Sequence, residues 1–130
     1  MIAKFHHIAL IVESLDKAIP QLETLGAKFV SKDASQAEGR TSAHLQLGGI
    51  EIVLMEPLGE GGEVARLLKA RGEGVHSLSF EVDNLETVLE TLTSKGIRVV
   101  YKGSALGYNF SFTHPKDCCG VMFELVERAG

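Results

Sequence analysis

The strongest constraint on how this chain can fold is an internal repeat, because two segments seventy positions apart follow one plan. F-H-H-I-A-L-I-V at Phe5–Val12 is matched by V-H-S-L-S-F-E-V at Val75–Val82, each with a histidine after its first residue. The register then holds without a gap, pairing Leu15 with Leu85, Ala18 with Val88, Leu22 with Leu92, Gly26 with Gly96 and Val30 with Val100. Two copies are too few for an open solenoid, so we expect them to pair into one closed unit. The functional site is then expected where the copies meet.

Length and composition restrict the class of protein. Each half of the 130 residues is too short to bury a core alone, which predicts a single domain over 1–130. No apolar run approaches the ~20 residues of a membrane helix, and the first residues lead directly into a strand pattern without a signal peptide. A net charge of −4 without a basic stripe argues against nucleic-acid binding. The two adjacent cysteines, Cys118 and Cys119, indicate reduced thiols in a cytoplasmic protein.

Module one is predicted to cover residues 4–56. A strand at Lys4–Val12 carries apolar side chains on both faces and is followed by a helix capped at Ser14 and ended by Gly26. Pro20 lies inside this helix, so we expect a kink or a late start. The remaining predicted elements are a short strand at Ala27–Ser31, a loop at Asp33–Gly39 and a hairpin, Thr41–Leu47 with Ile50–Glu56, turning at Gly48-Gly49.

Module two is predicted to cover residues 75–128, after a linker at 57–74 that contains a short helix, Glu63–Arg71, stopped by Gly72. The plan of module one recurs. Its predicted elements are a strand at Val75–Val82, a helix at Leu85–Lys95, a strand at Ile97–Tyr101, a loop at Lys102–Tyr108 and a closing pair, Asn109–Thr113 with Gly120–Glu127. The fold class is therefore α+β: two tandem β-α-β-β-β modules forming a cupped eight-stranded mixed sheet. One helix packs on one side of each half, which leaves the other face free.

Four segments resemble a known family. They are H-I-A-L-I-V-x-S-L-D-K-A, I-E-I-V-L-M-E-P-L, R-G-E-G-V-H-S-L-S-F-E-V-D-N and F-T-H-P-K-D-C-C-G-V-M-F-E-L-V-E. Together they are similar to the vicinal oxygen chelate superfamily, which includes glyoxalases and bleomycin-resistance proteins, and most of all to methylmalonyl-CoA epimerases. The resemblance covers about Phe5 to Glu127. It implies paired modules, a homodimer, and a divalent metal held by four side chains that stabilises an enolate.

The four metal positions of the family can be located in this chain. The resemblance places the first ligand at His7 and the last at Glu124, where suitable donors stand. It places the second at Val53 and the third at Ser77, where valine is no ligand and serine is a poor one. The repeat agrees, since His7 pairs with Ser77 and Val53 pairs with Glu124 after a one-residue slip. With two donors left, we expect no bound metal.

The proton-abstracting glutamate of many bacterial epimerases corresponds to Ser42, which cannot act as a base unaided. His44 is the remaining plausible donor, provided that its face of the hairpin turns inward. His6 and His76 have the wrong strand parity and should point away from the site unless a bulge re-aims one of them. The predicted ligand pocket therefore comprises Ser77, Val53, Ser42 and His44.

His7 and Glu124 are the predicted catalytic pair, since a glutamate beside a histidine in a partly apolar cavity can serve as acid and base. The alternative is a leftover pair that only hydrogen-bonds inside the cup. His114 is expected to fix a turn, and Cys118-Cys119 to fill one.

The sequence thus predicts a metal-independent small-molecule-binding protein or a diverged isomerase or lyase. The alternative is a divalent-metal-dependent acyl-CoA epimerase or glyoxalase-type lyase with an irregular site holding Co, Ni, Zn or Mn. A third hypothesis is a non-catalytic dimeric subunit whose cup is filled by its own side chains. The expected partners are a small-molecule ligand, possibly an acyl-CoA thioester, and a second copy of the chain. Neither nucleic acid nor membrane is expected.

Overall fold

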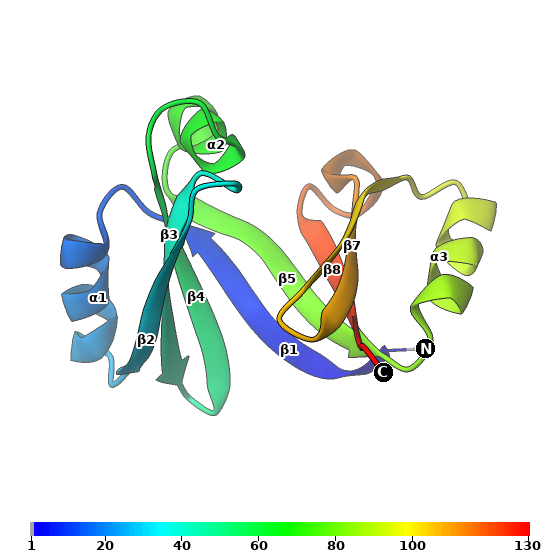
Figure 1. Cartoon of the computed structure of the whole chain (residues 1–130), viewed down its shortest axis with the longest axis horizontal. Coiled ribbons are helices and arrows are strands. Elements are labelled where there is room, and N and C mark those ends of the chain that lie inside the picture. Colours follow the sequence, from blue (N-terminus) through cyan, green and yellow to red (C-terminus); the bar gives the residue numbers. More distant parts are fainter. Residues whose placement is uncertain (1) are drawn as a thin grey trace. The chain divides into compact units, whose positions relative to one another are not determined.

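The computed structural model describes residues 2–130, which form two compact units (Figure 1). The N-terminal unit is His7–His76, and the C-terminal unit combines residues 2–6 with Ser77–Gly130. Along the chain, the order β-α-β-β-β occurs twice with a helix between the copies, as the repeat predicts. Over residues 2–130, no helix has the length and apolar character needed to cross a membrane.

The N-terminal unit is a four-stranded sheet in the order β2-β3-β4-β1. β1 (Ile2–Ile11) runs parallel to β4 (Ile50–Pro57), whereas β3 (Arg40–Leu47) is antiparallel to both β4 and β2 (Lys28–Ser35). The predicted two-residue turn joins β3 to β4, with φ of 60° at Gly48 and 84° at Gly49. Positive φ at both central residues is what a turn matching the twist of its strands requires, and glycine adopts it without strain.

Helix α1 (Leu15–Thr24) packs on one face of this sheet (Figure 1). Its buried side chains are Leu15 and Ala18. They join a core cluster with Val12, which follows β1, and with residues of β3 and β4: Ala43, Leu45, Ile52 and Leu54. The helix starts directly after Ser14, so Pro20 in its interior does not delay the start. Gly26 follows the helix with a φ of 106°, as expected of a glycine that stops one.

Strand β2 is longer than the sequence predicts. Residues 33–35 were expected in a loop, but they continue the pairing with β3, with Asp33 opposite Ser42 and Ser35 opposite Arg40. Hydrogen bonding to β3 orders this polar segment, which lacks the apolar alternation that would mark it as a strand. The turn between β2 and β3 is therefore limited to residues 36–39, shorter than the expected loop. As a consequence Asp33 has a fixed strand position.

Helix α2 (Glu63–Arg71) has the predicted bounds, and Gly72 stops it. It covers part of the sheet face opposite α1, where Val64, Leu67 and Leu68 pack against a second cluster made of Ala9, Ile11, Val53 and Met55. The expectation that this face stays free is therefore wrong for the N-terminal unit. The apolar stripe of α2 needs burial, and the apolar end of this face supplies it.

The C-terminal unit repeats the arrangement with strand order β5-β8-β7-β6. β5 (Gly74–Val82) is parallel to β8 (Met122–Arg128), and β7 (Tyr108–Thr113) is antiparallel to both β8 and β6 (Val99–Ala105). Helix α3 (Leu85–Ser94) buries Leu85 and Val88 against Val82 and Leu125. The expected loop at 102–108 is mostly strand, because β6 continues to Ala105 opposite Tyr108 and leaves only Leu106 and Gly107 for the turn.

The first residues of β1 pack within the C-terminal unit. Phe5 meets Phe80 edge to face with ring centroids 5.3 Å apart, and His6 meets Tyr108 in the same way at 5.0 Å. Edge-to-face aromatic pairs add to the stabilisation from area burial. Lys4 Nζ lies 3.9 Å from Glu81 Oε1. These contacts hold the first residues of β1 against β5 and β7 within the C-terminal unit.

Candidate functional site

Four of the predicted site residues share one face of the N-terminal sheet. Strand register places Val53 opposite His44 and beside Ala9, while Ser42 stands opposite Met55. Because side chains alternate along a strand, His7 shares the face of Ala9 and Val53. This is the face opposite α1. His44 therefore shares a sheet face with His7 and Val53, and its predicted role as a donor stays a prediction.

Val53 lies in hydrocarbon. Its side chain is 7% exposed, and its cluster partners are Ala9, Ile11 and Met55 from the sheet with Val64 from α2. The position where the family resemblance puts a metal ligand is thus a packed apolar site. A charged donor there would have to give up water without compensation.

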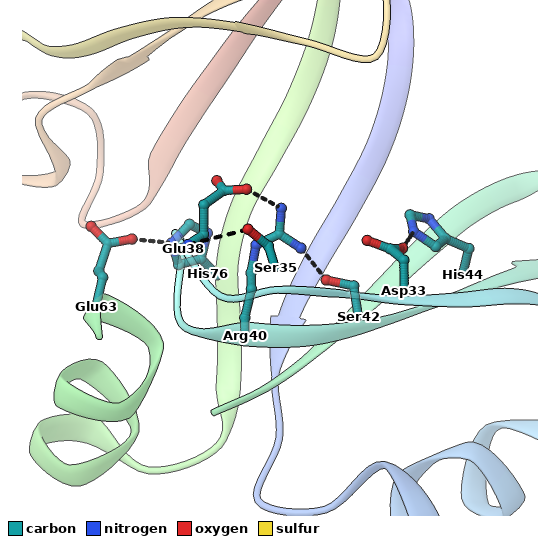
Figure 2. A network of polar contacts seen from close by, with 8 residues as sticks. All are labelled: Asp33, Ser35, Glu38, Arg40, Ser42, His44, Glu63 and His76. Atoms are coloured by element: carbon teal, nitrogen blue, oxygen red, sulfur yellow. Dashed lines mark hydrogen bonds and ion pairs between the residues drawn. The ribbon is translucent and has the colours of Figure 1, made fainter. Parts of the chain in front are cut away.

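His44 is held between two carboxylates. Its Nδ1 lies 2.8 Å from Glu51 Oε2 on β4, and its Nε2 lies 2.9 Å from Asp33 Oδ1 on β2. Figure 2 shows the contact with Asp33. The histidine is 23% exposed, Glu51 is 30% exposed and Asp33 is 55% exposed. Asp33 therefore occupies the more open side of the ring.

Arg40 and Ser42 precede His44 at alternate positions of β3, and their side chains project to the same side of the strand (Figure 2). The Arg40 guanidinium donates to the fully buried Ser42 hydroxyl and, at 2.9 Å, to Glu38 Oε2. Ser42 therefore has a charged partner. Nothing in this environment makes the hydroxyl a base, in line with its predicted inability to replace a glutamate.

The buried His76 belongs to the same unit and lies 3.3 Å from Glu63 at the first turn of α2 (Figure 2). The hydrogen bond from His76 is the main reason that the pKa of Glu63 is lowered, and the charges of His76, Arg66 and Arg71 add to it against desolvation. This contact anchors the start of α2. It gives His76 a structural partner on the helix that covers Val53.

In the C-terminal unit, Ser77 and Glu124 are placed by the parallel pair β5–β8. Ser77 stands opposite Met122, and Ser79 stands opposite Glu124. The Ser79 hydroxyl donates to the Glu124 carboxylate. Both serines are buried, Ser77 at 2% exposure and Ser79 at 0%. Glu124 is half-buried, so this face carries a carboxylate fixed by a hydroxyl.

Strand register confirms the predicted equivalence of Val53 and Glu124. His7 pairs with Glu51 in the N-terminal unit as Ser77 pairs with Met122 in the other, and two residues later Val53 and Glu124 take the same place. The repeat therefore presents a hydrocarbon and a carboxylate at one structural position. The catalytic roles proposed for His7 and Glu124 stay predictions.

Sequence reasoning did not single out Asp33, Arg40, Glu51 or Ser79. Glu51 could have been found, since it is two residues before Val53 in the same strand and must share its face. Ser79 could have been found in the same way, since it is two residues after Ser77 in the same strand. Asp33 could not, because its position depends on the unexpected extension of β2. In residues 2–130, no three His, Cys, Asp or Glu side chains are grouped as metal ligands would be.

The H-P-K-D segment is a structural element. His114 accepts a hydrogen bond from the Lys116 backbone N–H and so caps the short 3-10 helix Pro115–Asp117, as predicted for a turn-fixing residue. Asp117 accepts two side-chain hydrogen bonds from Arg98, at 2.9 and 3.1 Å, and a third from its backbone. These bonds lower the pKa of Asp117 to about 2. Cys118 and Cys119 follow as free thiols in the turn.

An open groove of about 600 Å³ lies between α3 and the β6–β7 hairpin. Leu85, Leu89 and Val99 line it together with Glu86 and Glu127. Glu127 is three residues from Glu124, so strand alternation puts the two carboxylates on opposite faces. The groove is consequently on the helix side of the sheet and does not contain the predicted site residues.

Comparison with known proteins identifies the family. Residues 6–112 match the model of the Glyoxalase/Bleomycin resistance protein/Dioxygenase superfamily. The chain belongs to this superfamily. A relative from Cereibacter sphaeroides, an ethylmalonyl-CoA/methylmalonyl-CoA epimerase, is 34% identical over 96% of this chain and 98% of its own.

Solved structures of this superfamily confirm the predicted vicinal oxygen chelate fold. Methylmalonyl-CoA epimerase from Mycobacterium tuberculosis matches with a TM-score of 0.86 and 32% identity over 99% of this chain and 90% of its own. A variant of the Streptomyces coelicolor epimerase, in complex with 2-nitronate-propionyl-CoA, also gives a TM-score of 0.86, at 28% identity over the whole of both chains.

Proposed function

We propose that this chain binds an acyl-CoA thioester and exchanges the proton on the carbon next to the thioester carbonyl, without a metal held by four side chains. The observation that carries the proposal is the Glu124 carboxylate, fixed by the Ser79 hydroxyl on the β5–β8 pair. A positioned carboxylate is the group that such an exchange needs. The relatives support the substrate class, since they are named for ethylmalonyl-CoA and methylmalonyl-CoA and one was solved with an acyl-CoA ligand.

The proposed step uses residues of this chain alone. Glu124 takes the α-proton, and the electron pair of the broken C–H bond forms the enolate, with the negative charge on the thioester oxygen. A proton from solvent, added to the opposite side of the carbon, inverts it, and Glu124 then loses its own proton to solvent. The catalytic role predicted for His7 stays a separate prediction. Acid–base catalysis of this kind contributes roughly 10²–10⁴-fold.

The metal-free part of the proposal is supported by the two positions that lack donors. Val53 is packed among apolar side chains, and Ser77 offers a buried hydroxyl, which is a poor metal ligand. The four-ligand metal implied by the family resemblance does not fit this donor set. No catalytic step is therefore assigned to a metal.

A metal-dependent epimerase with an irregular site is the second candidate. It is favoured by Glu51, which stands opposite His7 in the β1–β4 pair and could offer an oxygen donor two residues from Val53. The predicted homodimer and cytoplasmic location stay predictions under either reading.

Exchange of the α-proton of methylmalonyl-CoA in D₂O, followed by mass spectrometry, tests the proposal. We expect exchange by EDTA-treated, untagged protein, and a loss of about 100-fold or more in Glu124→Gln. Glu90→Gln, on the exposed side of α3, is the matched control and should keep the rate.

Titration calorimetry with Co²⁺, Ni²⁺, Zn²⁺ and Mn²⁺ separates the two candidates. A stoichiometric metal site, together with exchange that EDTA removes and metal restores, would establish the metal-dependent reading. If neither form of the protein exchanges the proton, the catalytic proposal is wrong, and the chain is a binding protein or a subunit without this activity.

A further inference from the structure

The groove between α3 and the β6–β7 hairpin has no part in the proposed exchange step. It lies on the helix side of the C-terminal sheet, whereas Glu124 is on the other face, and its lining belongs entirely to the C-terminal unit. Its volume of about 600 Å³ is within the range of about 300–1,000 Å³ that is usual for small-molecule sites. A ligand in this groove would therefore be separate from the proposed substrate.

Ser111 lines this groove and carries a hydroxyl that lacks a hydrogen-bond partner. The residue is 1% exposed, and among the described residues no donor or acceptor meets its Oγ. It stands on β7 opposite Leu125, which packs under α3, so its side chain is directed to the helix side of the sheet. A buried hydroxyl without a partner costs free energy, because it has lost its bonds to water and gained none in return. A ligand group that bonds to Ser111 would recover this loss.

Glu127 supplies a carboxylate beside Ser111. In the β7–β8 pair it stands opposite Asn109, two positions from the Ser111–Leu125 pair, so Ser111 and Glu127 are diagonal neighbours on one face. Diagonal neighbours are about 7 Å apart, and a long side chain spans that distance. One oxygen of Glu127 accepts the Leu85 N–H at 3.3 Å, and a carboxylate can accept further donors. A single nitrogen of a ligand can therefore reach both the hydroxyl and the carboxylate.

The charges around the groove favour a cation. Its lining carboxylates, which include Glu86 on α3 and Glu127 on β8, outnumber its one lysine, Lys102 on β6. Lys102 is exposed, whereas Glu127 is half-buried, so the negative charge lies deeper than the positive charge. A cation beside Glu127 is attracted and an anion is repelled, and both effects are stronger where water is partly excluded.

The groove also has an apolar wall. Leu85 and Leu89 contribute to it from α3, and Val99 contributes from the start of β6. Leu85 belongs to the core cluster of the unit, so this part of the wall is fixed in place. A metal ion would leave the wall in water, and over residues 2–130 no three metal-binding side chains are grouped. An organic cation with a hydrocarbon chain uses both the acidic and the apolar part of the groove.

We propose that this groove is a binding site for a small primary alkylammonium ion. Its N–H groups donate to the Ser111 hydroxyl and to the Glu127 carboxylate, and its chain lies along Leu85, Leu89 and Val99. An ammonium group carries three donors and no acceptor, so it can serve both oxygens at once. Hydrogen bonds to a charged group are roughly twice as strong as those between neutral groups, which distinguishes this ligand from an alcohol of the same length.

Three probes of equal chain length test the proposal. They are n-hexylamine, whose amine is charged at neutral pH like that of lysine, neutral n-hexanol and anionic hexanoate. Backbone amide signals in ¹⁵N NMR report where and how tightly each probe binds. We expect hexylamine to shift the Ser111 and Leu89 amides in a saturable way. Hexanol should bind about tenfold more weakly, and hexanoate should not bind.

Two variants test the residues that hold the ammonium group. Ser111→Ala should weaken hexylamine binding by about tenfold, and Glu127→Gln should weaken it by at least as much. Ser31→Ala and Glu23→Gln change the same residue types at exposed positions of the N-terminal unit and should bind as the wild type does. Without ligand, Ser111→Ala should leave the free energy of unfolding unchanged or raise it, since the hydroxyl has no partner to lose.

Any of three results would overturn the inference. They are a wild type without saturable shifts, equal affinities of the wild type for hexylamine and hexanol, and equal affinities of Ser111→Ala and the wild type for hexylamine. The comparison of the three probes needs no variant, so a Glu127→Gln protein that fails to fold does not remove the test. In each of these cases the Ser111 hydroxyl would be bonded by solvent, and the groove would be a consequence of how α3 packs.

Discussion

The two units carry the same fold with opposite chemistry at one equivalent position. In the N-terminal unit, Val53 lies among apolar side chains under α2, whereas in the C-terminal unit Glu124 receives a hydrogen bond from Ser79. The register of the parallel pairs is the same in both, so backbone geometry does not explain the difference. What differs is the covering of the sheet at this position, because α2 packs over Val53 on part of one face of the N-terminal sheet.

This difference indicates how two copies of one module can carry different side chains at equivalent positions. Once a helix buries the apolar end of one face, a carboxylate there costs free energy and a valine gains it. The polar groups of the N-terminal unit are then found at Glu51, two residues before Val53, and at His44, opposite Val53 on β3. The C-terminal unit has a carboxylate, Glu124, at the position equivalent to Val53.

Exchanging the two residues between the equivalent positions should give the largest effect on stability. Val53→Glu puts a carboxylate into the cluster under α2, and we expect it to lower the free energy of unfolding by about 3 kcal/mol or more. Glu124→Val removes a half-buried acceptor of Ser79 and should cost about 1 kcal/mol. Urea unfolding of both variants checks this, and equal losses would mean that the two positions are equally polar.

The sequence predicts the repeat, the order of elements and the bounds of α2, because these depend on local patterns of apolar residues, glycines and caps. It does not predict the ends of β2 and β6, where polar residues such as Asp33 and Ser104 become strand through pairing with a neighbour. Pattern reasoning detects alternating burial, and edge strands bury little.

The candidate site also has a part that the sequence predicts and a part that it does not. Its family positions, His7, Val53, Ser77 and Glu124, follow from the repeat and the resemblance. The partners of His44 do not, because Asp33 and Glu51 reach it across two strand pairs. The pairing of β2 with β3 also shifts register between Phe29 and Ser31, so the position of Asp33 cannot be counted from the sequence. The sequence pattern identifies the apolar stripe of α2. It does not show which face of the sheet that stripe packs against.

The helices of the two modules offer a second comparison, with an intermediate effect. Pro20 stands inside α1, where α3 has Glu90 at the equivalent position, and both side chains are exposed. Pro20→Ala restores a backbone N–H within the helix and should raise the free energy of unfolding by about 1–3 kcal/mol. Glu90→Ala is the matched change in α3 and should have almost no effect. Thermal and urea unfolding measure both, and a destabilised Pro20→Ala would show that the proline fits its site better than alanine.

The helix caps give the smallest and most local comparison. Asn84 begins α3, and its side chain accepts the Thr87 N–H at 3.0 Å, whereas Ser14 at the start of α1 makes no such side-chain bond. A cap stabilises a helix by satisfying a free N–H of the first turn, so its removal costs free energy only where that bond exists. We expect Asn84→Ala to lower the free energy of unfolding by about 1 kcal/mol.

Ser14→Ala should cost less than about 0.5 kcal/mol, since no cap bond is lost. Urea titrations at one protein concentration would resolve the two values, and hydrogen exchange at the Thr87 amide would report the α3 cap directly. A loss at Ser14 as large as that at Asn84 would show that the hydroxyl of Ser14 caps α1 in solution. The helices of the two modules would then start in the same way.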